Sequence, residues 1–400
     1  MQLKQFFTGV AAKRLSAVEA DIATSNQHEL NGINRFRQFL GTQRRTFATT
    51  FAHVGADEEL TTATGEVTWY DSRANTPNRP AEYRLYYTPT PVSRLFAEGD
   101  IVIVARRPDD SVLVIATPFD SAITDRLLWL FGLDPAQLNR QVLGEDQIDR
   151  PVDFVVRRIL ESIGIETPVD EFDPQRIHAR FGGQLPSSRE FSDFARGEAG
   201  ECDPVEDPDH AMLRWLDVEE RLFKAFERLL IEERLRAGFL AGDGKADAES
   251  FIAFSLSVQN RRKSRAGRAL ENHIERILEA HGLRFDRGAR TEGESKPDFL
   301  FPGAKEYADA TFPSERLAIL GAKATCKDRW RQLLDEADRV RVKHLLTLEP
   351  GISTNQTDAM RHRQVQLVVP AGIQPTYRPE QIAWLWDLRR FIAHVRTMQA

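Results

Sequence analysis

Three residues in the second half of the chain are of the types that metal-assisted phosphodiester hydrolysis requires. Asp298 follows a proline at the start of a short apolar segment, Lys323 lies further along the chain, and Glu336 follows it. Carboxylate oxygens bind hard divalent cations, and such a cation activates water for attack on a phosphate. A lysine beside it could stabilise the charge that develops on the phosphate. The alternative is a strand pair with an ordinary surface ion pair, because this spacing is common.

Apolar patterning indicates the elements that must position these side chains. Segments 298–301 and 317–325 are expected to be strands, which would carry Asp298 and Lys323. Apolar residues at helical spacing over 327–340 predict a helix that bears Glu336 on the same face as Arg329 and Leu333. Further strands are expected over 344–348 and 365–369, and further helices over 152–163, 210–238, 249–258, 269–281 and 379–397.

A cationic run lies between two of these expected helices. Within residues 260–268 there are five cations and no acid: Arg261, Arg262, Lys263, Arg265 and Arg268. Such a run is often only a solvated face, but without neighbouring acids it favours contact with DNA phosphates. The nearby Glu271 is either an ordinary surface partner or a further catalytic acid.

The first 135 residues or so predict a small, mostly β module. Segments 67–70 and 83–87 are rich in aromatic and β-branched residues, and 101–104 with 112–115 form an expected hairpin. Residues 127–131 predict a helix that covers the sheet. Cationic and amide side chains in the expected loops suit contacts with the phosphates and base edges of DNA. The alternative is that they only form a solvated loop. These residues are Lys13, Arg14, Asn26, Gln27, His28, Arg73, Asn75, Arg79 and Arg84.

Composition limits the class of protein. Four hundred residues suffice for two or three domains, and the net charge of −6 argues against a uniformly basic coat without excluding a local basic cleft. Cys202 and Cys326 have no Cys or His at zinc-ligand spacing, which fits a reducing compartment. We find no signal-peptide pattern and no apolar run of roughly eighteen residues, so we expect a cytoplasmic protein without a membrane segment. The acid-rich segment 197–210 is expected to be an exposed linker.

From roughly residue 209 to residue 370 the chain resembles the catalytic domain of EcoRII-type restriction endonucleases, within the PD-(D/E)XK nuclease superfamily. Segments 260–267, 296–302 and 322–332 carry the resemblance. It implies an α/β catalytic domain with a mixed central sheet flanked by helices. The superfamily usually has an acid two residues before the lysine, but that position is Gly321 here. The EcoRII-like branch takes its second carboxylate from the following helix, and Glu336 matches that position.

The resemblance also implies roles for individual residues. Asp298 and Glu336 would hold Mg²⁺, Lys323 would complete the catalytic set, and Tyr307 is a secondary catalytic candidate. Residues Lys327, Asp328 and Arg329 match the segment that reads C·G pairs in the major groove. The amino-terminal module is more weakly similar to the family's B3-like effector domain, a mostly β pseudobarrel that binds a second DNA copy. We therefore expect an effector domain over 1–170, a linker over 171–209 and the catalytic domain over 210–400.

Together these features predict a type II restriction endonuclease. A homodimer would use Mg²⁺ to cut both strands of a short, C·G-rich, CCWGG-like palindrome, with DNA bound to the amino-terminal module as an activator. The partners expected are double-stranded DNA and a second copy of the chain. A cognate DNA methyltransferase would protect the host without a stable complex. Two alternatives stay open: a nuclease that cuts only modified DNA, and a DNA-binding protein with a silent nuclease fold.

Overall fold

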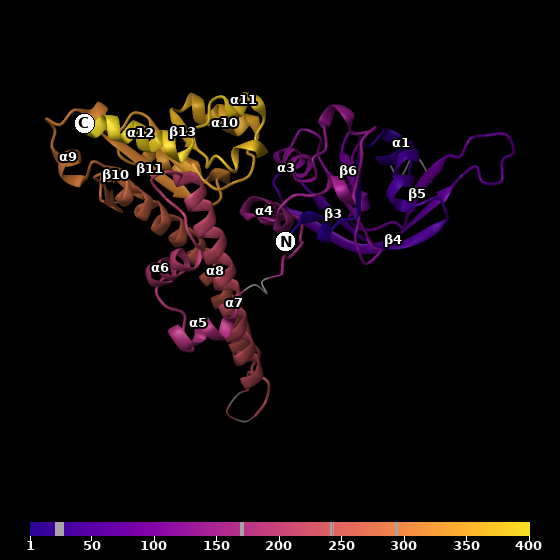
Figure 1. Ribbon diagram of the computed structural model, residues 1–400, viewed down its shortest axis with the longest axis horizontal. Coiled ribbons are helices and arrows are strands. Elements are labelled where there is room, and N and C mark those ends of the chain that lie inside the picture. Colours follow the sequence, from indigo (N-terminus) through magenta and orange to yellow (C-terminus); the bar gives the residue numbers. More distant parts are fainter. Residues whose placement is uncertain (21–27, 169–171, 241, 243, 293–294) are drawn as a thin grey trace. The chain divides into compact units, whose positions relative to one another are not determined.

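The protein is described by a computed structural model that covers residues 1–20, 28–168, 172–240, 242, 244–292 and 295–400; for Lys327, Asp328 and Arg329 it describes the backbone only. The chain divides into two compact units (Figure 1). Unit 1 comprises Met1–Thr167 with Thr376–Arg378, and unit 2 comprises Pro168–Pro375 and Pro379–Ala400. No helix among the described residues is long and apolar enough to cross a membrane.

Unit 1 is built on an eight-stranded sheet with the order β2-β5-β4-β3-β7-β6-β1-β8. All neighbouring strands are antiparallel except β3 and β7, which run parallel. Four helices, α1 (Ala17–Ala20), α2 (Arg37–Leu40), α3 (Ala122–Phe131) and α4 (Phe154–Ser162), accompany the sheet. The strands are β1 (Gly9–Arg14), β2 (Glu29–Leu30), β3 (Arg45–Val54), β4 (Leu60–Asp71), β5 (Tyr83–Tyr87), β6 (Ile101–Arg106), β7 (Val112–Thr117) and β8 (Val142–Gly144).

The apolar patterning of unit 1 explains its core. Strands β6 and β7 are buried on both faces and form the expected hairpin, while Trp69 and Tyr83 stack with ring centroids 5.0 Å apart. The predicted strands over 67–70 and 83–87 are confirmed as parts of β4 and β5, and the predicted helix over 127–131 is the end of α3. The mostly β character predicted for this module is confirmed.

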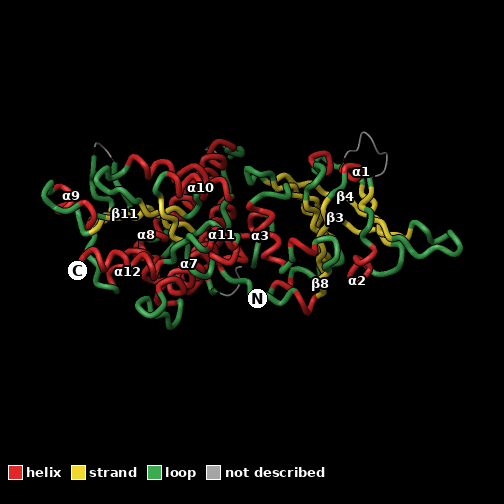
Figure 2. The backbone as a smooth tube through the Cα atoms, turned by 90° about the horizontal axis from the view of Figure 1, so that it is seen from above, coloured by secondary structure: helices red, strands yellow, loops and turns green. Residues whose placement is uncertain are grey.

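Unit 2 has a five-stranded mixed sheet with the order β13-β12-β11-β10-β9. Figure 2 shows β11 in yellow among helices in red, such as α8, α10 and α12. Strands β9, β10 and β11 pair antiparallel, whereas β11, β12 and β13 pair parallel. Helices and short 3-10 segments connect the strands, so the predicted α/β class is confirmed. The strands are β9 (Asp286–Arg287), β10 (Phe299–Phe301), β11 (Ala318–Lys323), β12 (Lys343–Thr347) and β13 (Val365–Val368).

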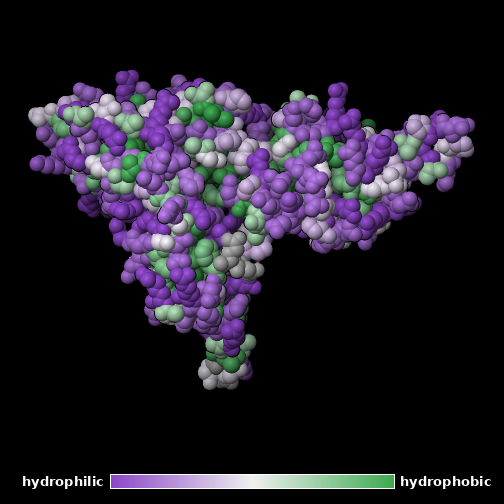
Figure 3. Space-filling model, viewed as in Figure 1, coloured by the Kyte–Doolittle hydropathy of each residue, from purple (hydrophilic) through white to green (hydrophobic). Residues whose placement is uncertain are grey.

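Two long helices precede this sheet in the sequence. The predicted helix over 210–238 is confirmed as α7 (Pro208–Ala237). The prediction of separate helices over 249–258 and 269–281 is wrong, because α8 (Ala248–Ala280) runs unbroken for 33 residues and includes the cationic run. Near the connection between α7 and α8, large apolar side chains are exposed (Figure 3), namely Leu235, Leu240, Phe251, Ile252 and Leu256.

The prediction of a linker over 171–209 also requires correction. Helices α5 (Pro174–Phe181) and α6 (Ser188–Glu198) lie within this segment and pack against α7 and α8. Ile177 and Phe191 are buried in these contacts, so the segment is part of unit 2. Unit 2 also includes α9 (Ala304–Ala308), η6 (Ser314–Arg316), η7 (Lys327–Asp335), α10 (Thr354–His362), α11 (Pro379–Ile382) and α12 (Leu388–Gln399). The 3-10 segment η8 (Gln374–Thr376) ends at Thr376, which is assigned to unit 1. The final helix predicted over 379–397 is thus two helices, because Trp386 bridges to Val368 between them.

Candidate active site

Strands β10 and β11 bring Asp298 and Lys323 together. Asp298 lies immediately before β10, and Phe299 pairs with Leu320 across the antiparallel ladder. The Asp298 Oδ2 atom accepts hydrogen bonds from Lys323 Nζ at 2.9 Å and from the backbone N–H of Ala322 at 2.7 Å. The pair is partly exposed, so its ends face solvent while the strands that carry it are buried.

The glycine that replaces the usual superfamily acid has a packing reason. A Cβ atom at Gly321 would lie 2.9 Å from Cδ1 of Leu333, which is buried on η7. A side chain at position 321 would therefore require the Leu333 side chain to move. Gly321 itself supplies no carboxylate, so the second acid of the site is expected from another residue.

Glu336 supplies that acid, but not from a helix as predicted. Segment η7 is a 3-10 helix that ends at Asp335, and Glu336 is its C-cap with an extended backbone. Ala337 follows with φ +52°, so the predicted helix over 327–340 stops one turn early. The shared face proposed for Arg329, Leu333 and Glu336 does not exist, because the backbone leaves the helix at Glu336.

Glu336 nevertheless interacts electrostatically with Asp298. Burial raises the pKa of the Glu336 carboxyl, the negative charge of Asp298 raises it further, and Lys323 and Lys343 act in the opposite direction. Among the described residues, none donates a hydrogen bond or forms an ion pair with the Glu336 carboxylate. Two ionised carboxylates that interact in this way repel each other, and a bound cation would relieve that repulsion.

The donor set suits a hard divalent cation. The described residues contain no cluster of three or more His, Cys, Asp or Glu side chains able to enclose a metal. Mg²⁺ does not need such a cage, because it usually keeps several waters and is held by one or two carboxylates together with substrate phosphate oxygens. Asp298 and Glu336 fit that pattern, and Lys323 lies beside them.

Tyr307 lies near the site in sequence, but its hydroxyl is occupied. The phenol is 7% exposed, donates a hydrogen bond to Glu292 Oε1 and accepts one from the backbone N–H of Arg339 at 3.4 Å. Burial and the hydrogen bond to Glu292 raise its pKa to about 12. A phenolate nucleophile is therefore disfavoured, and the contacts indicate a structural role for Tyr307.

The predicted base-reading segment begins η7. Lys327, Asp328 and Arg329 form the first turn of this 3-10 helix, directly after the strand that carries Lys323. The side chains of all three lie outside the described residues, so their contact with DNA stays a prediction.

The cationic run has partners that the sequence did not reveal. Arg262 Nε donates to Glu227 Oε2 at 2.5 Å, and Glu227 lies fully buried on α7. Arg265 donates to the carbonyl of Pro186 and lies over the rings of Phe191 and Phe223, 5.1 and 5.2 Å from their centroids. These contacts of Arg262 and Arg265 join α8 to α6 and α7. Lys263 is exposed and Arg261 half-buried, and their contact with phosphates stays a prediction.

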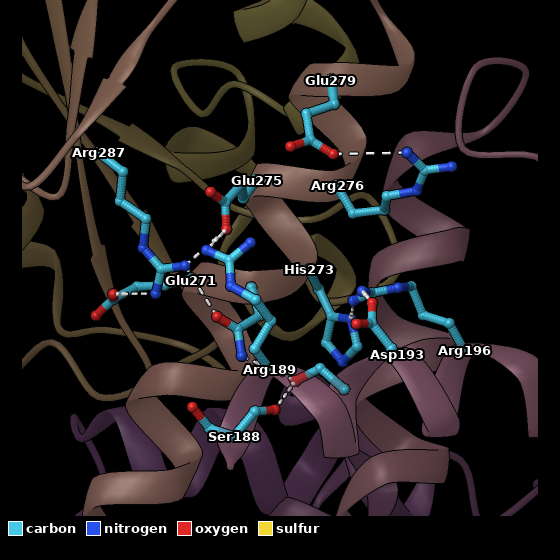
Figure 4. Close-up of polar contacts among 12 residues, drawn as sticks. Ser188, Arg189, Asp193, Arg196, Glu271, His273, Glu275, Arg276, Glu279 and Arg287 are labelled. Carbon is cyan, nitrogen blue, oxygen red and sulfur yellow. Dashed lines mark hydrogen bonds and ion pairs between the residues drawn. The ribbon is translucent and has the colours of Figure 1, made fainter.

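Glu271 has a structural partner on the first strand of the sheet (Figure 4). Arg287 of β9 donates to Glu271 Oε2 at 2.7 Å, to Glu275 Oε2 at 2.7 Å and to Asn272 Oδ1 at 2.9 Å. Arg189 of α6 reaches Glu275 from the other side at 2.8 Å. This network joins α6, α8 and β9, and β9 pairs with β10 beside Asp298.

Several predicted effector contacts in unit 1 are engaged in ion pairs. Lys13 is 9% exposed and pairs with buried Glu19, Arg84 pairs with Glu29 at 2.9 Å, and Arg73 pairs with Glu82. Arg14 Nε donates to the carbonyl of Gly99 at 3.2 Å. A cavity of about 310 Å³ is lined by residues that include Lys13, Arg14, Asn31, Arg35, Asn139 and Gln141.

The remaining effector candidates are less constrained. Asn75 and Arg79 are exposed on the loop between β4 and β5, and His28 is half-buried. Asn26 and Gln27 lie outside the described residues. Binding of DNA by any of these residues stays a prediction.

Comparison with known proteins finds two solved structures that are similar to part of the chain: metal-depleted Ecl18kI in complex with uncleaved, modified DNA, and the restriction endonuclease PspGI in complex with substrate DNA. The Ecl18kI structure has a TM-score of 0.46 and 16% sequence identity, and the match covers 56% of this chain and 83% of that chain. The PspGI structure has a TM-score of 0.44 and 17% identity, and the match covers 57% of this chain and 95% of that chain. The type II restriction enzyme EcoRII of Escherichia coli is 42% identical over 228 residues, which is 57% of this chain and 54% of that protein.

The chain therefore spans about half the length of that curated relative. The family model described as EcoRII C terminal matches residues 223–392, a range that contains Asp298, Lys323 and Glu336. The carboxy-terminal region of this chain, residues 223–392, is therefore similar to the EcoRII C-terminal family.

Proposed function

We propose that this chain is a type II restriction endonuclease that hydrolyses both strands of DNA with Mg²⁺. The observation that carries the proposal is the meeting of Asp298, Lys323 and Glu336 in a domain similar to the EcoRII C-terminal family. Burial and mutual repulsion make this arrangement costly in the metal-free protein, which is typical of a site kept for function.

The chain's own residues have distinct tasks in the proposed reaction. Asp298 and Glu336 would hold the cation, which when bound lowers the pKa of water and neutralises phosphate charge. The Lys323 ammonium pairs with Asp298 in the free protein. With DNA bound, it would orient the attacking water and donate a hydrogen bond to the scissile phosphate, where negative charge develops.

The proposed specificity is for a short, CCWGG-like palindrome. Lys327 and Arg329 can donate to guanine O6 and N7, and Asp328 can accept from cytosine N4. Their position on η7, directly after β11, would place base recognition next to the catalytic lysine. A cognate methyltransferase would protect the host's own copies of the site.

We further propose a homodimer with an activating amino-terminal domain. A symmetric cut in both strands calls for two catalytic sites related by a two-fold axis. The exposed apolar side chains near the α7–α8 connection are of the kind that mediates association between chains. Unit 1 would bind a second DNA copy through its loops, where Asn75 and Arg79 are exposed.

Run-off sequencing of plasmids with defined methylation tests the proposal. With Mg²⁺, the wild-type protein should give discrete ends at one short C·G-rich sequence, and Lys323→Ala should give none. Cleavage of methylated plasmid only would identify a modification-dependent nuclease. DNA binding without cleavage by the wild-type protein would identify a silent nuclease fold and contradict the proposal.

A further inference from the structure

The turn that follows Glu336 has an unfavourable backbone and many supports. Ala337 adopts φ +52°, a region that a residue with a Cβ atom rarely occupies. Such a conformation persists only when the surrounding structure holds it. The turn is closed by a hydrogen bond from Val340 N to the carbonyl of Ala337 at 2.9 Å. Because Glu336 begins this turn, whatever holds the turn also sets the direction of its carboxylate.

Three side chains from outside the turn bind its backbone. Lys343, buried on β12, donates to the carbonyl of Glu336 and, at 3.1 Å, to that of Ala337. Glu292 Oε2 accepts from the N–H of Asp338 at 3.2 Å. The Tyr307 hydroxyl accepts from the next N–H of the turn and donates to the other oxygen of Glu292. Donors and acceptors of the turn are thus held from two sides.

Arg339 fastens the same turn to the end of α9. Its guanidinium donates to the carbonyls of Tyr307, of Asp309 at 2.9 Å and of Phe312 at 2.6 Å. With a further contact to the carbonyl of Glu306 at 3.5 Å, four carbonyls around one guanidinium fix the turn relative to the segment that follows β10, the strand that begins just after Asp298. These hydrogen bonds therefore hold the turn that begins at Glu336 against the segment of chain that continues from Asp298 and β10.

We infer that Glu292, Tyr307 and Arg339 form a clamp that positions Glu336 for cation binding. The inference rests on the proposed nuclease function. None of the three needs to touch the cation, so they are positioning residues. Outer partners that orient a ligand commonly contribute tenfold or more to metal affinity, and loosening the clamp should weaken cation binding about tenfold. Saturating cation should then restore the cleavage rate, because the chemical groups remain in place.

Electron paramagnetic resonance titration of Mn²⁺ measures this affinity directly. Tyr307→Phe removes one hydroxyl, and Glu292→Ala alters an exposed side chain, so at least one folded variant is available. Both should bind Mn²⁺ about tenfold more weakly than the wild type and regain cleavage at saturating Mn²⁺. Arg339→Met should show the larger effect. Arg214→Met is the matched control, because Arg214 of α7 also donates to a backbone carbonyl, that of Ala199, and takes no part in the clamp.

Each part of the inference can fail separately. Unchanged Mn²⁺ affinity in both Tyr307→Phe and Glu292→Ala would overturn the clamp while leaving the metal site intact. A cleavage rate that stays low at saturating Mn²⁺ would also overturn it, because the residue would then act in the chemical step. If Asp298→Asn leaves Mn²⁺ binding unchanged, the proposed metal site itself is wrong.

Discussion

Replacing Glu336 with glutamine should have opposite effects on the stability of the metal-free protein and on that of the metal-bound protein. Burial and Asp298 raise the pKa of Glu336, so the folded state holds this proton more tightly than the unfolded state does. The stability contributed by the group is present below its unfolded pKa and is lost as pH rises through its folded pKa. Above that folded pKa the ionised carboxylate thus destabilises the metal-free fold. Glutamine has the same shape without the charge, so metal-free Glu336→Gln should be at least as stable as the wild type.

With the cation bound, the wild type should be more stable than Glu336→Gln. A ligand that binds only the folded state at a hundred times its Kd stabilises it by about 2.7 kcal/mol. For a unit of this size that corresponds to about 5–11 °C in melting temperature. The wild type should show this shift on adding Mg²⁺ or Mn²⁺, and Glu336→Gln should lose most of it at the same concentration.

Calorimetry of the wild type, Glu336→Gln and Glu315→Gln, with and without cation, measures both effects. Glu315 is an exposed acid on η6 and serves as the control for a change of charge alone. A Glu336→Gln protein that is less stable without cation, yet gains the full shift with it, would refute the reasoning. Glu336 would then be a structural residue.

Three other predictions concern the same unit. Lys323→Ala should slow cleavage by about 10²- to 10³-fold, which is the usual loss when one electrostatic donor is removed. Its affinity for DNA, measured in a gel-shift assay with Ca²⁺, should not change. Loss of DNA binding would contradict a catalytic role for Lys323. Protons compete with the cation for the Glu336 carboxylate. The Mg²⁺ concentration that gives half-maximal cleavage should therefore rise about tenfold for each pH unit below the pKa of Glu336. If that concentration does not depend on pH, Glu336 is not a metal ligand. The buried Asp209 carboxylate accepts hydrogen bonds from the backbone N–H groups of Ala371, Leu388 and Arg389. Asp209→Ala should therefore lower the free energy of unfolding by about 2 kcal/mol, and Asp209→Asn should lower it much less. Denaturant titration measures both changes. Burial raises the pKa of Asp209 to about 6, so its contribution should fall as pH rises from about 4 to 6 in the wild type but not in Asp209→Asn.

Local patterns in the sequence predicted strands β4 to β7 and β10 to β13, but not β1, β2, β3, β8 or β9. Apolar runs such as 101–104 and 298–301 became buried strands because a fully apolar short segment has no exposed face to present. Asp298 and Lys323 could be paired in advance for the same reason, since each lies at the end of such a strand.

Features that depend on distant partners were not predictable from the sequence. The cationic run suggested a break in α8, but Glu227 neutralises Arg262 and aromatic rings enclose Arg265, so the helix continues. Helical spacing beyond Asp335 was misleading because hydrogen bonds from Lys343 stabilise a left-handed Ala337 instead. These contacts join residues from separate elements, and no local pattern records them.

Diffraction from crystals soaked in Mn²⁺, with an anomalous difference map, shows whether Asp298 and Glu336 bind one cation together. We expect one strong peak within about 2.2 Å of a carboxylate oxygen from Asp298 and one from Glu336, with Lys323 Nζ beside it. A peak bound by only one of the two acids, or carboxylates too far apart for one ion to bridge, would show that they do not form a shared metal site.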